Sequence, residues 1–130
     1  MRVREQHGHR RRVLIIEDHL DSVRTLANLL RTMGHEVDYA MNGYSGIALA
    51  DTFEPHAVFV DLVLPDLTGW AVARALRARP ALKLARLYAI TGHFGQEARQ
   101  RSIAVGFDDH FVKPVHPDIF ERLLGDQPCG

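Results

Sequence analysis

The sequence predicts an α/β fold in which five parallel β-strands alternate with five α-helices around a doubly wound sheet. Short, continuous apolar runs such as residues 13–16 and 57–60 are typical of strands buried on both faces. Segments with apolar residues at helical spacing lie between these runs. A regular alternation of strands and helices favours a parallel sheet with helices on both of its faces.

Each expected strand is a short apolar or alternating segment bounded by turn residues or by the end of a helix. The five strands are expected at residues 13–16, 35–40, 57–60, 87–90 and 107–112. Pro55 breaks the chain before the third strand, which ends at Asp61, and Thr91-Gly92 follows the fourth.

Each expected helix is bounded by residues that start or stop helices. The five helices are expected at residues 20–33, 44–53, 70–79, 96–105 and 117–124. Gly34 and Gly106 are expected to end the first and fourth helices, and Pro80 the third. Asn42-Gly43 is expected to form a turn before the second helix, and Pro117 opens the last one.

Composition excludes several classes of protein. The chain has 130 residues, of which 46% are hydrophobic and 25% charged, as in a soluble domain. Its 16 basic and 16 acidic residues cancel, so no overall charge draws it to nucleic acid or to a membrane. No apolar run reaches the roughly 18 residues of a membrane span. The single Cys129 cannot form an internal disulfide, which favours a cytoplasmic location.

Three parts are expected along the chain. Residues 1–11 are polar and rich in arginine, and we expect a flexible arm, with contact to nucleic acid or an acidic surface as the alternative. Residues 12–124 form the single domain. Residues 125–130 are expected to be a tail, too short for a further module.

Polar side chains follow four of the five expected strands. Glu17 and Asp18 follow the first strand, Asp61 the third, Thr91 the fourth and Lys113 the fifth. In a parallel sheet the carboxyl ends of the strands share one edge, where ligands bind. Each residue alone has a plain explanation, as a helix cap, a loop acid, a turn residue or a solvated lysine. The complete set in this order instead predicts one pocket.

This pocket suits phosphoryl chemistry. Carboxylates are hard oxygen ligands that suit Mg²⁺, which usually keeps several waters and binds phosphate as well. Asp61 is a candidate nucleophile, because carboxylates form aspartyl-phosphate intermediates. Phosphoryl transfer depends on neutralising charge on the transferred group, and the cation, Lys113 and Thr91 could do so.

Four segments resemble the receiver domain of bacterial response regulators, of the chemotaxis-regulator type. They are residues 13–18, 58–69, 89–92 and 106–114. The resemblance extends from about Arg12 to Leu124, nearly the whole chain. It implies a flavodoxin-like (βα)5 fold with strand order 2-1-3-4-5.

The resemblance also implies a metal site and a phosphoacceptor. Asp61 would accept the phosphoryl group, and Glu17 and Asp18 would hold Mg²⁺ together with Asp61 and the backbone carbonyl of Val63. Glu17 departs from the commoner aspartate, and its longer side chain could alter the affinity for the metal. Val63 and His93 flank the site, and the apolar Val63 has no group to position a water, so we expect a long-lived phospho-form.

The same resemblance implies a switch. Thr91 would follow the phosphoryl group and Lys113 would pair with its oxygens, while Pro114 matches a family Lys-Pro pair that is often cis. The switch position carries His110 where the family usually has tyrosine or phenylalanine. His110 could move between outward and inward rotamers and add pH sensitivity, or it could be exposed and do little. Phe111 is expected to point to the other face of the sheet.

The leading hypothesis is a phosphorelay signalling switch. A histidine kinase or a histidine phosphotransfer protein would donate the phosphoryl group, and the domain would catalyse only its own phosphorylation and dephosphorylation. Phosphorylation would change partner binding at the fourth helix, fifth strand and fifth helix. The chain would be a stand-alone receiver or a receiver cut from a hybrid kinase. A downstream protein would bind the domain, and the domain could also form a homodimer.

Three alternatives are left open. A Mg²⁺-dependent phosphatase or phosphotransferase would also use an aspartyl nucleophile, but commonly needs a second acid at the position of Val63. A nucleotide- or flavin-binding module would need a phosphate loop after the first strand, where Glu17 and Asp18 repel phosphate. A degenerate receiver that acts by binding alone is compatible with Glu17 and His110.

Overall fold

The computed structural model describes residues 10–92 and 95–124, so His93, Cys129, the expected tail and residues 1–9 of the expected arm lie outside it. One parallel sheet runs through the middle of the fold in the order β2-β1-β3-β4-β5, which confirms the expected topology. Its strands are β1 (Arg12–Ile16), β2 (Glu36–Ala40), β3 (Ala57–Asp61), β4 (Arg86–Thr91) and β5 (Asp109–Val112). Arg11, at the end of the expected arm, bonds through its backbone to His35 and Glu36.

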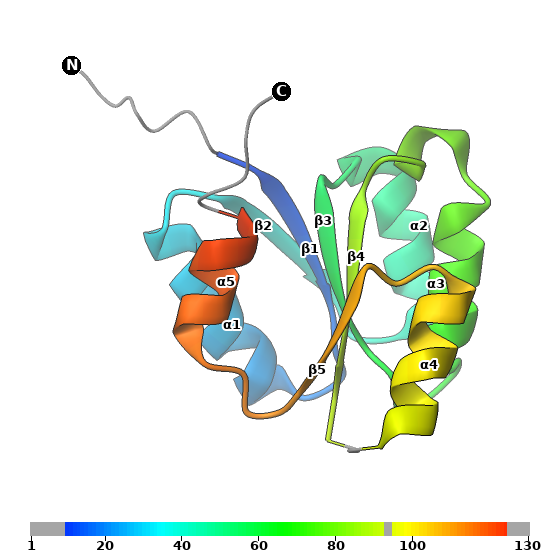
Figure 1. Cartoon of the computed structure of the whole chain (residues 1–130). Coiled ribbons are helices and arrows are strands. Elements are labelled where there is room, and N and C mark those ends of the chain that lie inside the picture. The colour runs from blue at the N-terminus through cyan, green and yellow to red at the C-terminus, as the bar shows by residue number, and fades with distance from the viewer. Residues whose placement is uncertain (1–9, 93–94, 125–130) are drawn as a thin grey trace.

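Within the described residues, five α-helices cover the two faces of the sheet (Figure 1). One face carries α1 (Leu20–Thr32) and α5 (Pro117–Leu124). The other carries α2 (Gly43–Phe53), α3 (Gly69–Arg77) and α4 (Gln96–Val105). None of the helices in the described ranges has both the length and the apolar character needed to span a bilayer.

Strand alternation divides the core into two clusters, one under each layer of helices. Along β3, Val58 and Val60 pack toward α3, whereas Phe59 packs toward α1 and α5. Phe59 stacks on Tyr88 with ring centroids 5.2 Å apart and meets Phe120 edge-on at 5.1 Å. The continuous apolar run of β3 is therefore explained by burial on both faces.

Several boundaries differ from those expected. Asn42 forms a helix cap, because its side chain accepts a hydrogen bond from the Ser45 N–H, and α2 therefore begins at Gly43. α3 ends at Arg77, and Pro80 begins a short 3₁₀ turn (Pro80–Leu82) where we expected it to stop the helix.

The fifth strand is shorter than expected, beginning at Asp109 and not at residue 107. The chain turns at Gly106 with φ +117°, a left-handed conformation that suits glycine, and Arg77 Nε donates to the Gly106 carbonyl at 2.9 Å. Phe107 is buried in the core, so its apolar side chain reflects packing and not membership of the strand.

Candidate functional site

Two acidic residues stand at the carboxyl ends of neighbouring strands. β1 and β3 pair in parallel with Ile16 opposite Val60, and this register places Glu17 beside Asp61. Both acidic residues are only 6% exposed. The predicted convergence of residues separated by 44 positions in the chain follows directly from this strand register.

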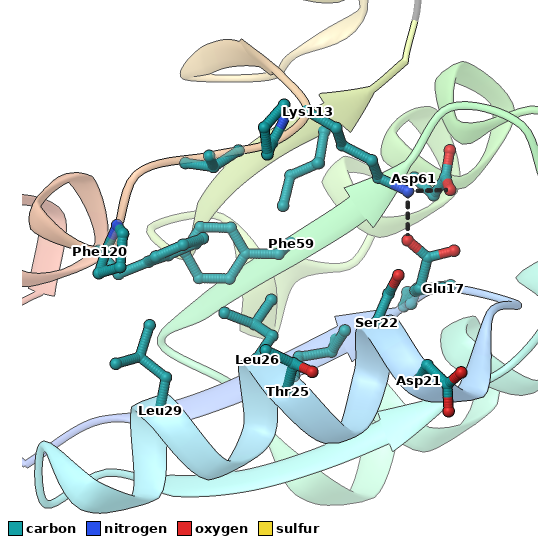
Figure 2. Close-up of a pocket in the computed structure, with 16 residues that line it drawn as sticks. Glu17, Asp21, Ser22, Thr25, Leu26, Leu29, Phe59, Asp61, Lys113 and Phe120 are labelled. Carbon is teal, nitrogen blue, oxygen red and sulfur yellow. Dashed lines mark hydrogen bonds and ion pairs between the residues drawn. The ribbon is translucent and has the colours of Figure 1, made fainter.

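Lys113 neutralises part of the acidic charge. Its Nζ donates to Glu17 Oε1 at 2.5 Å and to Asp61 Oδ2 at 2.9 Å (Figure 2). β5 positions this lysine, because the Lys113 backbone N–H donates to the Thr91 carbonyl at 2.8 Å. Burial lowers the pKa of Lys113, but the hydrogen bonds and charges of Glu17 and Asp61 outweigh it and raise the pKa above its usual value. The ammonium group therefore stays protonated.

Hydrogen bonds to both of its oxygens orient the Asp61 carboxylate. Its Oδ2 accepts from Lys113, and its Oδ1 accepts from the Val63 backbone N–H at 2.9 Å. Val63 itself is 58% exposed. The role of the Val63 carbonyl as a metal ligand stays a prediction.

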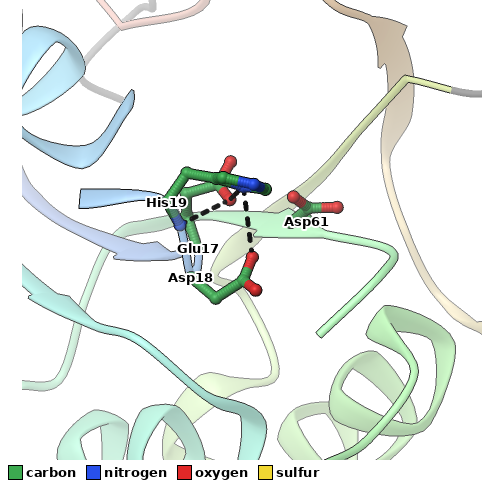
Figure 3. Close-up of side chains that lie close together, drawn as sticks. All are labelled: Glu17, Asp18, His19 and Asp61. Atoms are coloured by element: carbon green, nitrogen blue, oxygen red, sulfur yellow. Dashed lines mark hydrogen bonds and ion pairs between the residues drawn. The ribbon is translucent and has the colours of Figure 1, made fainter. Parts of the chain in front are cut away.

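Asp18 carries an oxygen that fits a cation. The capping residue of α1 is His19, so Asp18 does not cap this helix, and its Oδ1 is buried without a hydrogen-bond partner. Burying such an oxygen is costly unless a positive group satisfies it. Ligand atoms of Glu17, Asp18, His19 and Asp61 lie within 4.8 Å of one another (Figure 3). The carboxylate oxygens among these donors suit a divalent cation such as Mg²⁺.

Sequence reasoning did not include His19 in this group. The available signal was its position directly after two acidic residues at the end of a strand. Its Nδ1 lies 3.2 Å from Glu17 Oε2 and 3.4 Å from Asp18 Oδ1.

Thr91 shares the edge but faces another cavity. It is fully buried at the end of β4, and strand alternation points it toward the α4 side. There it lines a cavity of 490 Å³ with Val63, Trp70 and Ala98. Asp61 and Lys113 instead line a groove on the opposite side of the sheet. The proposed movement of Thr91 toward a phosphoryl group remains a prediction.

The groove beside Asp61 is mainly apolar and has a volume of 590 Å³. Figure 2 shows Leu26 and Leu29 of α1 on one side and Phe120 of α5 on the other, with Phe59 between them. Glu17, Asp61 and Lys113 also line this groove, so it adjoins the acidic edge.

His110 is buried, so the expectation that it is exposed is wrong, while its role at the switch position stays a prediction. It is 4% exposed, and neither ring nitrogen makes a hydrogen bond of good geometry. β5 places it opposite Ala89, on the α4 side of the sheet, where Arg99 donates to its carbonyl at 3.2 Å. Phe111 packs in the other core cluster, as expected from strand alternation.

Burial lowers the pKa of His110 below 6.5, and the Arg99 charge adds to this effect, against weaker opposition from Asp109 and the Ala98 backbone. The unfolded chain therefore takes up the proton first as pH falls. We expect the free energy of unfolding to decrease below about pH 6.5, by at most about 1.4 kcal/mol per pH unit for this proton. His110→Phe should remove this part of the slope.

Urea unfolding between pH 7.5 and pH 5.5 measures the effect. His116→Ala, which removes a 72% exposed histidine side chain, should keep the slope of the wild type. An unchanged slope in His110→Phe would mean that His110 does not contribute.

Comparison with known proteins agrees with the fold. The profile of the response regulator receiver domain matches residues 13–124, and the chain belongs to this family. Its class of function is therefore that of a phosphorelay signalling switch. The chain is 37% identical over 117 residues to the probable transcriptional regulatory protein SilR of Salmonella typhimurium, covering 87% of this chain and 47% of SilR. It thus spans about half the length of this relative.

Two solved structures show the same fold. The chemotaxis response regulator CheY4 of Vibrio cholerae superposes with a TM-score of 0.82 at 25% identity, over 88% of this chain and 99% of CheY4. The receiver domain of the sensor histidine kinase PA1611 from Pseudomonas aeruginosa PAO1 superposes with a TM-score of 0.80 at 24% identity, over 88% and 93%. The PA1611 structure has a magnesium ion in its active-site cleft.

Proposed function

We propose that this domain accepts a phosphoryl group on Asp61 from the histidine of a kinase or phosphotransfer protein. The observation that carries the proposal is the Lys113 ammonium, which bridges Glu17 and Asp61 beside an Asp18 oxygen that accepts no hydrogen bond. An oriented carboxylate, a fixed positive charge and ligands for a cation thus meet at one edge of the sheet.

In this reaction an oxygen of Asp61 attacks phosphorus. The bond from phosphorus to the donor imidazole nitrogen breaks, and its electron pair stays on that nitrogen. Lys113 then shifts its hydrogen bonds from the carboxylate toward the phosphoryl oxygens. Mg²⁺, held by Glu17, Asp18, Asp61 and the Val63 carbonyl, would neutralise charge on the same oxygens. Water then attacks phosphorus, the bond from phosphorus to the Asp61 oxygen breaks, and inorganic phosphate and the free carboxylate result.

Phosphorylation of Asp61 would change the structure of the domain on its α4 side. Thr91 lines the cavity that separates the β3–α3 loop from α4, and His110 is buried under α4. A phosphoryl group that draws Thr91 toward Asp61 would change packing beneath α4 and so shift an existing equilibrium. We propose that a downstream protein in the cytoplasm binds the surface formed by α4, β5 and α5.

Acetyl phosphate tests the proposal. Intact mass should show one added phosphoryl group per chain with Mg²⁺ and none with EDTA, and peptide mapping after reductive trapping should place it at Asp61. No labelling of the folded chain in Mg²⁺ would favour a receiver that acts by binding alone. Repeated turnover of p-nitrophenyl phosphate would favour the phosphatase alternative.

Val63→Asn is expected to shorten the life of the phospho-form. The Val63 side chain is exposed beside Asp61, and an amide there could hold the attacking water. We expect phosphate release to be on the order of tenfold faster. Correct placement of a reactant lowers the free-energy barrier enough to raise a rate by at least this factor. A time course of phosphate release measures it, with Val63→Ala as the control for size. A wild type as fast as Val63→Asn would contradict the expectation.

A further inference from the structure

We infer that His19 adds a nitrogen ligand to the acidic cluster and makes the site prefer a late first-row divalent cation, such as Co²⁺, over Mg²⁺. The inference rests on the metal site of the proposed function and concerns which cation that site selects. Figure 3 shows the His19 ring beside Glu17 and Asp18, with its Nδ1 directed at both carboxylates.

The backbone holds His19 at the cluster. His19 caps α1 in an extended conformation, with φ −95° and ψ 110°, and its N–H donates to Glu17 Oε2 at 3.2 Å. The side chain is 73% exposed, and its ring contacts the carboxylates of Glu17 and Asp18. Because the ring is exposed, it could exchange these contacts for a cation without losing packing against buried side chains.

The charge of the cluster attracts any divalent cation. Three carboxylates meet the single ammonium of Lys113, which leaves a formal excess of negative charge. Charge alone does not distinguish Co²⁺ from Mg²⁺, since both carry the same charge. The choice between them must come from the ligand atoms.

The ligand atoms favour the later metal. Carboxylate and carbonyl oxygens suit Mg²⁺, whereas imidazole nitrogen suits zinc, copper, iron and nickel, and affinity rises along the first row toward copper. Mg²⁺ also gives up its waters reluctantly and gains little from a nitrogen donor. An imidazole within 4.8 Å of the carboxylate ligands should therefore raise the affinity for Co²⁺ selectively.

Calorimetric titration with Co²⁺ and with Mg²⁺ tests the inference on the full chain. All variants carry His7→Ala and His9→Ala, so that histidines of the N-terminal segment do not bind cobalt. His19→Ala should raise the dissociation constant for Co²⁺ by about tenfold or more. It should change that for Mg²⁺ by less than about threefold. The visible absorption of bound Co²⁺ should change in the same variant.

His116→Ala is the matched control. His116 is similarly exposed and its Nδ1 lies 3.6 Å from the Asp118 carboxylate, but it is outside the cluster. This variant should leave both affinities unchanged. Equal weakening of Co²⁺ and Mg²⁺ binding by His19→Ala, or no weakening of either, would overturn the inference.

The same titrations separate this inference from the proposed function. Asp18→Asn should weaken both cations, because it removes an oxygen ligand. If His19→Ala changes nothing while Asp18→Asn weakens Mg²⁺ binding, the inference fails and the proposed site stands. If the starting protein binds neither cation, both fail.

Discussion

Asp61→Asn is expected to take up no phosphoryl group from acetyl phosphate at any Mg²⁺ concentration. The amide removes the nucleophilic oxygen, and loss of a nucleophile costs several orders of magnitude in rate. Glu17 is not expected to replace it. Glu17 Oε1 is bound by Lys113, and Val63 orients only Asp61 through its N–H. Intact mass after incubation with acetyl phosphate measures the loss.

Asp61→Asn should fail to label because it lacks the nucleophile, and not because it is unfolded. Lys113 still pairs with Glu17 in Asp61→Asn, so the strand ends remain joined and the thermal midpoint should change little. Asp51→Asn provides the matched control, because Asp51 is half exposed and pairs with Arg79 at 2.6 Å, outside the acidic cluster. It should label like the wild type. Full labelling of Asp61→Asn would rule out Asp61 as the acceptor.

Gly69→Ala is expected to destabilise the fold by about 3 kcal/mol, the upper part of the range for overpacking. A Cβ at Gly69 would lie 2.6 Å from the Asp61 carbonyl oxygen and 2.7 Å from Leu62 Cα. Both are backbone atoms, which cannot move aside by rotating a side chain. The Gly69 N–H also donates to the Leu62 carbonyl at 2.9 Å, which holds the start of α3 against the end of β3.

The backbone shift caused by Gly69→Ala should also move Asp61, the proposed phosphoacceptor. Because the clash falls on the Asp61 carbonyl, relief of it moves the residue whose carboxylate must face Lys113. We therefore expect slower phosphorylation as well as a lower urea midpoint. Gly95→Ala is the control, since its Cβ would meet no atom within 4 Å and its φ of 169° is extended backbone. Its stability should stay within about 0.5 kcal/mol of the wild type. Equal urea midpoints for the two variants would contradict the prediction.

The strand ends illustrate how much of the site could be predicted. An apolar run, such as residues 57–60, must be buried on both faces, and a parallel sheet brings the ends of its strands to one edge. Glu17, Asp61 and Lys113 follow such runs, and the structure brings them into contact. Their proximity therefore follows from local pattern and one rule of topology.

Other contacts had no local signal. Asp66 caps α2 from the β3–α3 loop, with Oδ1 accepting from the Gly43 N–H at 2.7 Å and Oδ2 from the Tyr44 N–H at 2.9 Å. The Tyr44 hydrogen bond is the largest of the effects that lower the pKa of Asp66. These partners are more than twenty residues apart, so periodicity along either segment could not pair them.

Strand periodicity and the order of polar residues at strand ends determined the fold class, the edge that carries the site and its acidic chemistry, because these follow from local apolar patterns and from the rule that parallel strands end at one edge. Only the tertiary structure decided that His110 is buried, that Thr91 faces the α4 cavity and that Asp61 lies beside the ring of His19. Exposure and side-chain direction depend on which distant helix covers a position, and no window of sequence contains both partners.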